Sequence, residues 1–318
     1  MKQRIITATV MVLVFVPLLI LSIYFEPFVR IMEVVLFLVV VGATLELLFM
    51  YDKKEKLPIG VKIASAIITF VLYCNLVYTV YNYFNIFPAY QDSLFKYEPI
   101  IVKVIDKINL DSFFFTPIPT LAIMFIVYMS LMVLIPKFNV SEVGGLFIAS
   151  IYVSICVSAF TVLYMMGLRI VGYILLICVF TDIFALVFGR KFGKHKMAPV
   201  TSPKKTWEGS IGGTITALVV GTTFLVTYTI VSDNGFLRVD SYEDLNLALK
   251  IIIAIIMTLM LSICSQIGDL LASKLKRAYG IKDYSNIFPG HGGILDRFDS
   301  TFFASAIFLV IFIILICC

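Results

Sequence analysis

The stretch SQIGDLLASKLKRAYGIKDYSNIFPGHGGILDRFDS, residues 265–300, links two long apolar runs. It starts inside the last turns of the first run and ends in the first turn of the second. A cationic, glycine-rich loop lies between the two runs. Three carboxylates, those of Asp269, Asp296 and Asp299, stand where the apolar runs meet this loop. The stretch therefore predicts a polar site at the ends of two membrane helices.

The composition shows the setting of this site. The 318 residues are 61% hydrophobic and 14% charged, whereas soluble domains carry about 25% charged residues. Apolar runs of about 20 residues, the length that crosses a bilayer, recur along the chain. The sequence predicts an all-α polytopic membrane protein with about nine transmembrane helices. The expected spans cover residues 5–25, 31–50, 59–81, 117–135, 143–166, 170–188, 211–231, 247–272 and 301–318.

A single integral membrane domain is expected over residues 1–318. Its N-terminal part, 1–170, supplies helices and one long polar, extracytoplasmic segment, 82–116. Within that segment, Ile100–Ile108 is expected to form a short amphipathic helix at the membrane interface. The C-terminal part, 171–318, contains the helices and loops that carry the motifs. The six cysteines show no metal-ligand spacing, so we interpret them as packing residues.

The distribution of cations predicts the orientation of the chain. With nine spans and a cytoplasmic N-terminus, the cytoplasmic loops hold most of the 25 lysines and arginines, as the positive-inside rule requires. The loops at 189–209 and 273–297 then both face the cytoplasm, where nucleotides are found. The first apolar run is too long for a signal peptide, so we expect it to remain as a span. The net charge of +5 is too small to indicate nucleic acid as a partner.

Carboxylates on shared helix faces point to a metal ion. Gln266, Asp269 and Lys276 are spaced to lie on one polar face of a helix. A charged carboxylate that faces lipid costs about 2.5–3.5 kcal/mol even on the mildest insertion scale, so this face is expected to line a wet cavity. Asp296 and Asp299 share a helix face in the same way. Three such carboxylates suit Mg²⁺. The alternative is that each aspartate pairs with a nearby lysine or arginine.

The loop Phe288–Gly293 is a candidate anion site. Its glycines permit the backbone N–H groups to approach an anion closely. His291 would be a metal ligand, a donor to phosphate or a plain turn residue. Asp182, inside the sixth apolar run, is a further candidate because an acid within the membrane is costly unless it has a role.

The other cationic loop is also expected to bind phosphate. Ser202 and Pro203 suit the N-cap and the first residue of a helix. The N-terminus of such a helix, with Lys204 and Lys205, would point at the anion. Glu208 would steer a lysine or a metal-bound water. The alternative for the lysines is that they only set the topology.

Several segments resemble the signature of the phosphatidate cytidylyltransferase family, also called CDP-diacylglycerol synthases. They are Ser273-Lys-Leu-Lys-Arg277, Lys282-Asp283, Pro289-Gly-His-Gly-Gly293 and Asp296-Arg-Phe-Asp299. A second region of that family is similar to Ser202-Pro-Lys-Lys-Thr-Trp-Glu-Gly209 and to Asp182 with Gly189-Arg190. The specific resemblance covers roughly residues 180–300.

The resemblance implies a reaction in which CTP and phosphatidic acid give CDP-diacylglycerol and pyrophosphate. It also implies Mg²⁺ dependence, with one or two metal ions, and a homodimer. We expect a multi-pass protein of a bacterial plasma membrane with its active site facing the cytoplasm. The expected catalytic residues are Asp269, Asp296, Asp299, Lys205 and His291, and the three aspartates are the expected metal ligands. The expected substrate-binding residues are Asp182, Ser202, Lys204, Lys205, Thr206, Glu208, Ser273, Lys276, Arg277, Lys282, Gly290, Gly292, Gly293 and Arg297.

The residue chemistry agrees with this reaction. A lipid phosphate oxygen, with a second pKa of about 6, is already largely ionised at neutral pH, so no strong base is needed. Repulsion between two polyanions is the main obstacle, and metal ions and lysines remove it. Two other classes stay open. A CTP-dependent lipid-alcohol kinase would release CDP, and a cation-coupled transporter would bind its ion at the buried acids but would need a path to both sides.

Overall fold

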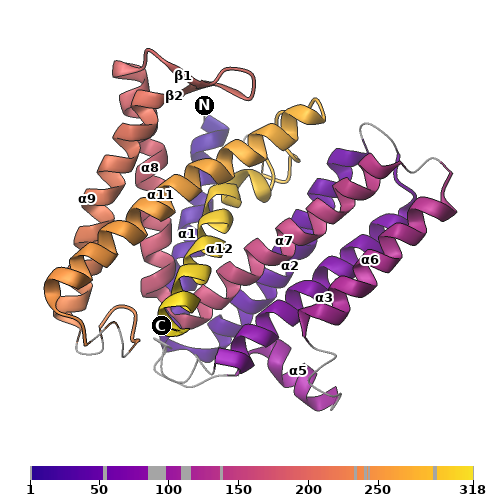
Figure 1. Cartoon of the computed structure of the whole chain (residues 1–318), viewed down its shortest axis with the longest axis horizontal. Coiled ribbons are helices and arrows are strands. Elements are labelled where there is room, and N and C mark those ends of the chain that lie inside the picture. The colour runs from indigo at the N-terminus through magenta and orange to yellow at the C-terminus, as the bar shows by residue number, and fades with distance from the viewer. Residues whose placement is uncertain are drawn as a thin grey trace. The chain divides into compact units, whose positions relative to one another are not determined.

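The structure is a computed structural model of the 318-residue chain (Figure 1). It describes residues 2–52, 56–84, 98–108, 116–136, 139–232, 235–239, 242, 244–288 and 292–317. The chain forms two compact units. Unit 1 consists of Met1–Met166 and Tyr279–Arg297, and unit 2 consists of Gly167–Ala278 and Phe298–Cys318.

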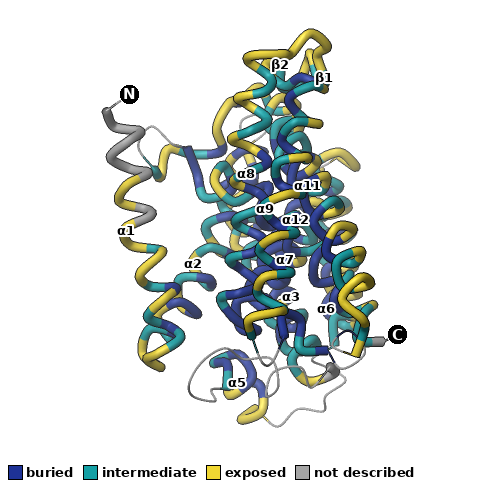
Figure 2. The backbone as a smooth tube through the Cα atoms, turned by 90° about the vertical axis from the view of Figure 1, so that its left-hand side faces the viewer, coloured by how far each residue is buried: buried dark blue, intermediate teal, exposed yellow. Residues whose placement is uncertain are grey.

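Unit 1 is a bundle of helices around α7. Figure 1 shows α2, α3, α6 and α7 running side by side. Buried positions follow α7 almost throughout its length (Figure 2), and hydroxyl groups link it to its neighbours, as where Tyr73 meets Thr161 at 3.1 Å. The helices of this unit are α1 (Lys2–Tyr24), α2 (Glu26–Tyr51), α3 (Ile59–Phe84), α5 (Ile100–Ile108), α6 (Pro117–Leu134) and α7 (Val140–Met166).

Unit 2 contains a second set of long helices and one small hairpin. Tyr173 is fully buried in this unit. Its hydroxyl forms a hydrogen bond with the Thr258 hydroxyl at 2.8 Å, and its ring packs edge-on against the ring of Phe236. Its elements are α8 (Leu168–Phe192), β1 (Lys196–Ala198), β2 (Ser202–Thr206), α9 (Trp207–Val231), α11 (Leu247–Ala278) and α12 (Leu295–Cys317), whose first turn belongs to unit 1.

The prediction of an all-α polytopic membrane protein is confirmed. Within the described residues, eight helices are long and apolar enough to cross a membrane, and α1 contributes a shorter apolar stretch, Leu13–Tyr24. In a bilayer the backbone must satisfy its own hydrogen bonds, which is why these apolar runs are helical. Most of the helices extend a few residues beyond their expected spans. α11 continues to Ala278 and α12 begins at Leu295, so the motif residues at both edges are helical.

The short amphipathic helix expected at Ile100–Ile108 is present as α5, with Ile101, Val102 and Ile105 buried. Glu33 of α2, itself only 2% exposed, accepts a hydrogen bond from Ile100 N at 3.1 Å and is paired with Arg30 at 3.0 Å. A carboxylate at a helix N-terminus satisfies an orphan donor and complements the helix dipole. Most of the remainder of the predicted polar segment 82–116 lies outside the described residues.

The hairpin corrects one prediction. Ser202 and Pro203 do not begin a helix, because they lie in β2, which pairs antiparallel with β1 in the register Ala198 to Ser202. Proline is compatible with an edge strand, since its missing N–H is not needed for pairing there. Helix α9 begins only at Trp207, where the Oγ1 of the N-cap residue Thr206 accepts from Gly209 N at 3.2 Å.

Glycines permit the close packing of α8 against α9. A Cβ added to Gly209 would come within 2.5 Å of the Ala185 carbonyl oxygen, and one added to Gly213 within 2.5 Å of the Thr181 carbonyl oxygen. Gly212 lies under the Phe188 ring in the same way. The two helices therefore approach until backbone meets backbone.

We expect Gly213→Ala to lower the thermal midpoint of the protein in detergent. The new methyl group would press on backbone atoms of α8 that cannot move aside, and overpacking of this kind costs about 1–3 kcal/mol. Gly172→Ala in α8 is the matched control, because a Cβ there would meet nothing within 4 Å. The measurement is the fraction of monodisperse protein after heating. Equal midpoints for the two variants would contradict the packing argument.

Candidate active site

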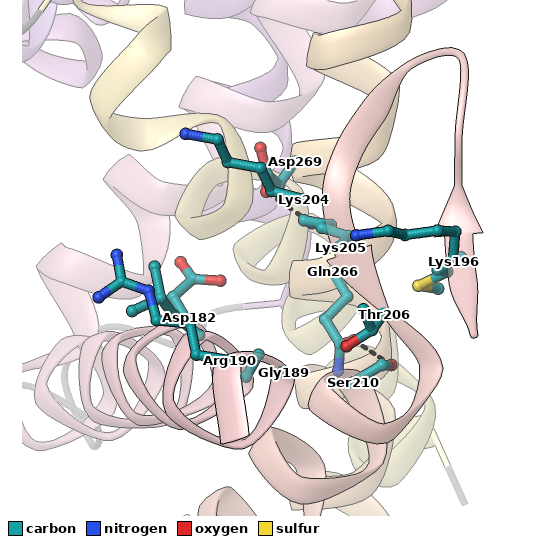
Figure 3. A pocket seen from close by; sticks show the side chains of 13 residues that line it. Asp182, Gly189, Arg190, Lys196, Lys204, Lys205, Thr206, Ser210, Gln266 and Asp269 are labelled. Carbon is teal, nitrogen blue, oxygen red and sulfur yellow. Dashed lines mark hydrogen bonds and ion pairs between the residues drawn. The ribbon is translucent and has the colours of Figure 1, made fainter. Parts of the chain in front are cut away.

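A cavity of about 490 Å³ opens in unit 2 at the end of α8 that is followed by the hairpin. Its walls come from α8, the hairpin, α9 and α11 (Figure 3). Nine of the residues that line it have polar or charged side chains. They are Asp182, Arg190, Lys196, Lys204, Lys205, Thr206, Ser210, Gln266 and Asp269.

Positive charge converges on this cavity from two elements. Arg190 comes from α8, whereas Lys196, Lys204 and Lys205 come from the hairpin on the other side of the cavity (Figure 3). The Lys205 Nζ lies 2.6 Å from the Asp269 Oδ2, and both side chains are about a third exposed or less, at 26% and 32%. The remaining cations outnumber the remaining acid, so the cavity suits a polyanion.

Two further carboxylates lie near the Asp269 carboxylate of this ion pair. Asp182, Asp269 and Asp299 are close enough to interact electrostatically with one another. Lys205 acts on Asp182 and Lys276 acts on Asp299, so lysines partly offset the repulsion. The structure thus brings together these three predicted aspartates and two predicted lysines. Among the residues that the structure describes, no three Asp, Glu, His or Cys side chains are arranged as a metal site.

A chain of polar side chains fixes the helices beneath the cavity. Ser210 of α9 donates to the Gln266 amide oxygen, and the Gln266 Nε2 donates to Thr214 Oγ1 at 2.9 Å. Ser262 continues the chain to Thr181 of α8, at 2.8 Å. Interhelical hydrogen bonds of this type hold membrane helices in register. The predicted polar face of α11 is confirmed at Gln266 and Asp269, which line the same cavity.

Glu208 has a different partner from the one expected. Its Oε1 accepts from His195 N at 3.1 Å and meets His195 Nδ1 at 2.6 Å. The pair therefore ties the start of the hairpin to the first turn of α9. In this structure Glu208 steers neither of the lysines Lys204 and Lys205, and a role with a metal-bound water stays a prediction.

The motif loop, residues 279–294, belongs to unit 1 and is closed by its own hydrogen bonds. Phe288 and Gly292 exchange two backbone hydrogen bonds, at 2.9 and 3.1 Å, and Gly292 has φ +88°, which favours glycine. Asp296 Oδ2 accepts from Gly293 N at 2.9 Å and from Tyr284 N at 2.8 Å. The N–H groups of Gly292 and Gly293 thus donate to acceptors within the protein in this structure. Substrate binding by these glycines stays a prediction.

The other predicted residues fall into four groups. Gly290 and His291 lie outside the described residues. Ser273, Lys276 and Arg277 lie on the last turns of α11, with Arg277 exposed. Lys282 and Arg297 are also exposed, on the motif loop and the first turn of α12. Ser202 and Thr206 are the first and last residues of β2, and Thr206 also lines the cavity.

Sequence reasoning missed Lys196 and Ser210 as cavity residues and gave Arg190 no role of its own. Lys196 belongs to the cationic loop at 189–209, where the sequence pattern assigns it no role at a site. The antiparallel register places it opposite Thr206, and that pairing puts it at the cavity. A prediction of Ser202–Thr206 as a strand would have placed Lys196 at the cavity.

The sequence model of the cytidylyltransferase family matches residues 2–315. The chain belongs to this family. The phosphatidate cytidylyltransferase of Staphylococcus saprophyticus is 42% identical over 137 residues, which are 43% of this chain and 46% of that protein. That of Staphylococcus haemolyticus is 44% identical over the same length and the same shares. That of Bacillus subtilis (strain 168) is 39% identical over 169 residues, 52% of this chain and 56% of that protein.

The match to this cytidylyltransferase family confirms the resemblance seen in the motifs. The chain spans about half the length of the curated relatives that it matches. It is an integral membrane protein with multiple apolar helices, and its named relatives are bacterial.

Proposed function

We propose that the protein is a phosphatidate cytidylyltransferase, which converts CTP and phosphatidic acid to CDP-diacylglycerol and pyrophosphate. The observation that carries the proposal is the cavity lined by Arg190 and three lysines beside Asp269. Its cations suit a nucleoside triphosphate, and its position on membrane helices suits a lipid co-substrate. Named relatives with this activity add support over about half of their length.

In the proposed reaction, the phosphate oxygen of phosphatidic acid attacks the α-phosphorus of CTP. A new P–O–P bond forms, and the bond between the α- and β-phosphates breaks to release pyrophosphate. Lys196, Lys204 and Lys205 would neutralise the triphosphate and reduce its repulsion of the lipid phosphate. Since the attacking oxygen is largely ionised at neutral pH, the residues need only position and neutralise the two substrates.

Mg²⁺ is proposed as the cofactor. Asp269, Asp296 and Asp299, from the sequence pattern, are its proposed ligands, and Asp182 neighbours two of them. The donor set fits, because aspartate oxygens are the hard ligands that Mg²⁺ prefers. A bound Mg²⁺ would withdraw charge from phosphate oxygens. In the present structure Asp269 forms an ion pair with Lys205.

The reaction is tested with purified protein, phosphatidic acid, Mg²⁺ and CTP labelled at the α-phosphate. We expect label in CDP-diacylglycerol, with one pyrophosphate released for each labelled lipid. Label that appears only in free CDP would instead indicate a lipid-alcohol kinase. Vesicle uptake of an ion without CTP would favour the transporter. A homodimer is also proposed, and the mass of the detergent-solubilised protein tests it.

We propose that the cavity faces the cytoplasm, on the basis of the cation distribution. A single cysteine at Lys194, which is exposed beside the hairpin, should react with a membrane-impermeant thiol reagent only from the cytoplasmic side. A cysteine at Lys107, exposed on α5, should react only from outside. Both variants are made in a background without the native cysteines. The opposite pattern of labelling would overturn the orientation.

A further inference from the structure

The carboxylate of Glu46, on α2, is buried at 2% exposure and holds the motif loop in place. Glu46 Oε1 accepts from Ser285 Oγ at 2.6 Å and from Ile294 N at 2.8 Å, and Glu46 Oε2 accepts from Leu295 N at 2.9 Å. These partners lie 239 to 249 residues away in the sequence but in the same compact unit.

The motif loop packs closely against α2 around the Glu46 carboxylate. A Cβ added to Gly293 would collide with the carboxylate of Glu46. A Cβ added to Gly42, one turn earlier on α2, would come within 2.5 Å of Ile294 Cδ1. A side chain at position 293 would therefore displace the hydrogen-bonded carboxylate of Glu46, whereas one at position 42 would only move the end of the Ile294 side chain.

The contact also satisfies a strict electrostatic requirement. Leu295 is the first residue of α12, so the N–H groups of Ile294 and Leu295 are among the donors that a helix leaves unpaired at its start. A buried carboxylate needs such donors, because burying it without partners is very unfavourable. Its negative charge is also favourable at the positive end of the helix dipole. Each side of the contact therefore depends on the other.

The residue after Leu295 is Asp296, whose Oδ2 accepts from Gly293 N and Tyr284 N. Two carboxylates, one from α2 and one from α12, thus divide the donors at this turn between them. The donors to Glu46 are therefore the residues immediately before Asp296 at the start of α12.

We infer that Glu46 is a positioning residue for the reaction, acting through the start of α12 on the predicted metal ligand Asp296. The inference rests on the proposed function. The competing explanation is that Glu46 only stabilises the fold. The structure provides a matched control for that explanation in Glu33, which lies on the same helix, is equally buried at 2%, and also accepts a backbone N–H at a helix start.

The test compares Glu46→Gln with Glu33→Gln. A glutamine has one acceptor oxygen in place of two, and its NH₂ group would face an N–H donor of the loop. We expect Glu46→Gln to lower kcat and to raise the Mg²⁺ concentration that gives the half-maximal rate. The value of kcat/KM should fall by about 10- to 100-fold, as is usual when the support of a metal ligand is lost. Glu33→Gln should lower the thermal midpoint but leave the Mg²⁺ dependence of the rate unchanged.

Two readouts are independent of activity. Mg²⁺ should raise the melting temperature of the wild type and of Glu33→Gln, but much less that of Glu46→Gln. Hydrogen exchange should accelerate at residues 292–299 in Glu46→Gln and at residues 98–108 in Glu33→Gln. If the wild type makes no labelled lipid, the proposed reaction fails while these two measurements still decide the role of Glu46.

Gly293→Ala is the second variant, for the case that Glu46→Gln does not fold. It keeps the charge of Glu46 but displaces the carboxylate, so we expect the same loss of Mg²⁺ response. If both variants fold, their effects should not add, because they break one contact. Equal Mg²⁺ responses in the wild type, in Glu33→Gln and in a folded variant at Glu46 or Gly293 would overturn the inference.

Discussion

Asp269→Asn is expected to lower turnover by about 10²- to 10³-fold, the range seen when one charged or polar group at a reacting centre is removed. Asn keeps the size of Asp but has no negative charge with which to hold a metal ion. Asp269 lines the cavity, pairs with Lys205 and interacts with Asp182 and Asp299, so the change falls where the charges of the site meet. The measurement is the initial rate of lipid labelling against Mg²⁺ concentration.

Asp52→Asn is the matched control for this prediction. Asp52 forms an ion pair with Lys62 in unit 1, and the two side chains are about as exposed as those of the Lys205–Asp269 pair, at 18% and 21%. Ion pairs that remain accessible to solvent contribute only about 0–1 kcal/mol to stability. Asp52→Asn should therefore have a nearly normal rate and Mg²⁺ dependence.

The same pair of variants separates metal binding from simple charge pairing. If Asp269 only neutralises Lys205, both variants should behave alike, with small changes in melting temperature and activity. If Asp269 holds Mg²⁺, its variant should require a higher Mg²⁺ concentration, and excess Mg²⁺ should restore part of the rate by mass action. A near-normal rate of Asp269→Asn at low Mg²⁺ would remove this aspartate from the proposed metal site.

Local sequence patterns predicted the helices because the bilayer leaves the backbone few alternatives. An apolar run that crosses lipid must pair its own N–H and C=O groups, so the length and composition of each run were sufficient. Gly209 and Gly213, which lie on one face of α9, likewise act locally, because they permit the close approach of α8. Each of these signals lies within a single segment.

The errors arose where a second, distant segment decides the structure. Ser202 and Pro203 are good helix-start residues, but pairing with Lys196–Ala198 makes them a strand. Glu46 could be recognised as an acid inside an apolar run, yet its partners lie more than two hundred residues later. The N–H groups of Gly292 and Gly293 donate to the Phe288 carbonyl and the Asp296 carboxylate, which the glycine pattern alone does not indicate, and anion binding by this loop stays a prediction.

The role of Lys205 is the second large effect that the cavity predicts. Lys205→Met should weaken CTP binding by about 10-fold or more, because a charge-assisted contact to a phosphate is lost. Lys205→Arg, which keeps the charge, should retain most of the affinity. Lys62→Met, which removes the cation of the ion pair outside the cavity, is the control and should leave CTP binding unchanged.

A double-mutant cycle with Asp269→Asn then distinguishes two roles of this lysine. If Lys205 serves only to neutralise Asp269, its loss should have no effect on CTP affinity once that aspartate is uncharged. If it binds the triphosphate, Lys205→Met should weaken CTP binding in both backgrounds. CTP affinity is measured by equilibrium binding in place of turnover, because Asp269→Asn is expected to turn over too slowly. We expect the second result, because Lys205 lines the same cavity as the other cations, which are Arg190, Lys196 and Lys204.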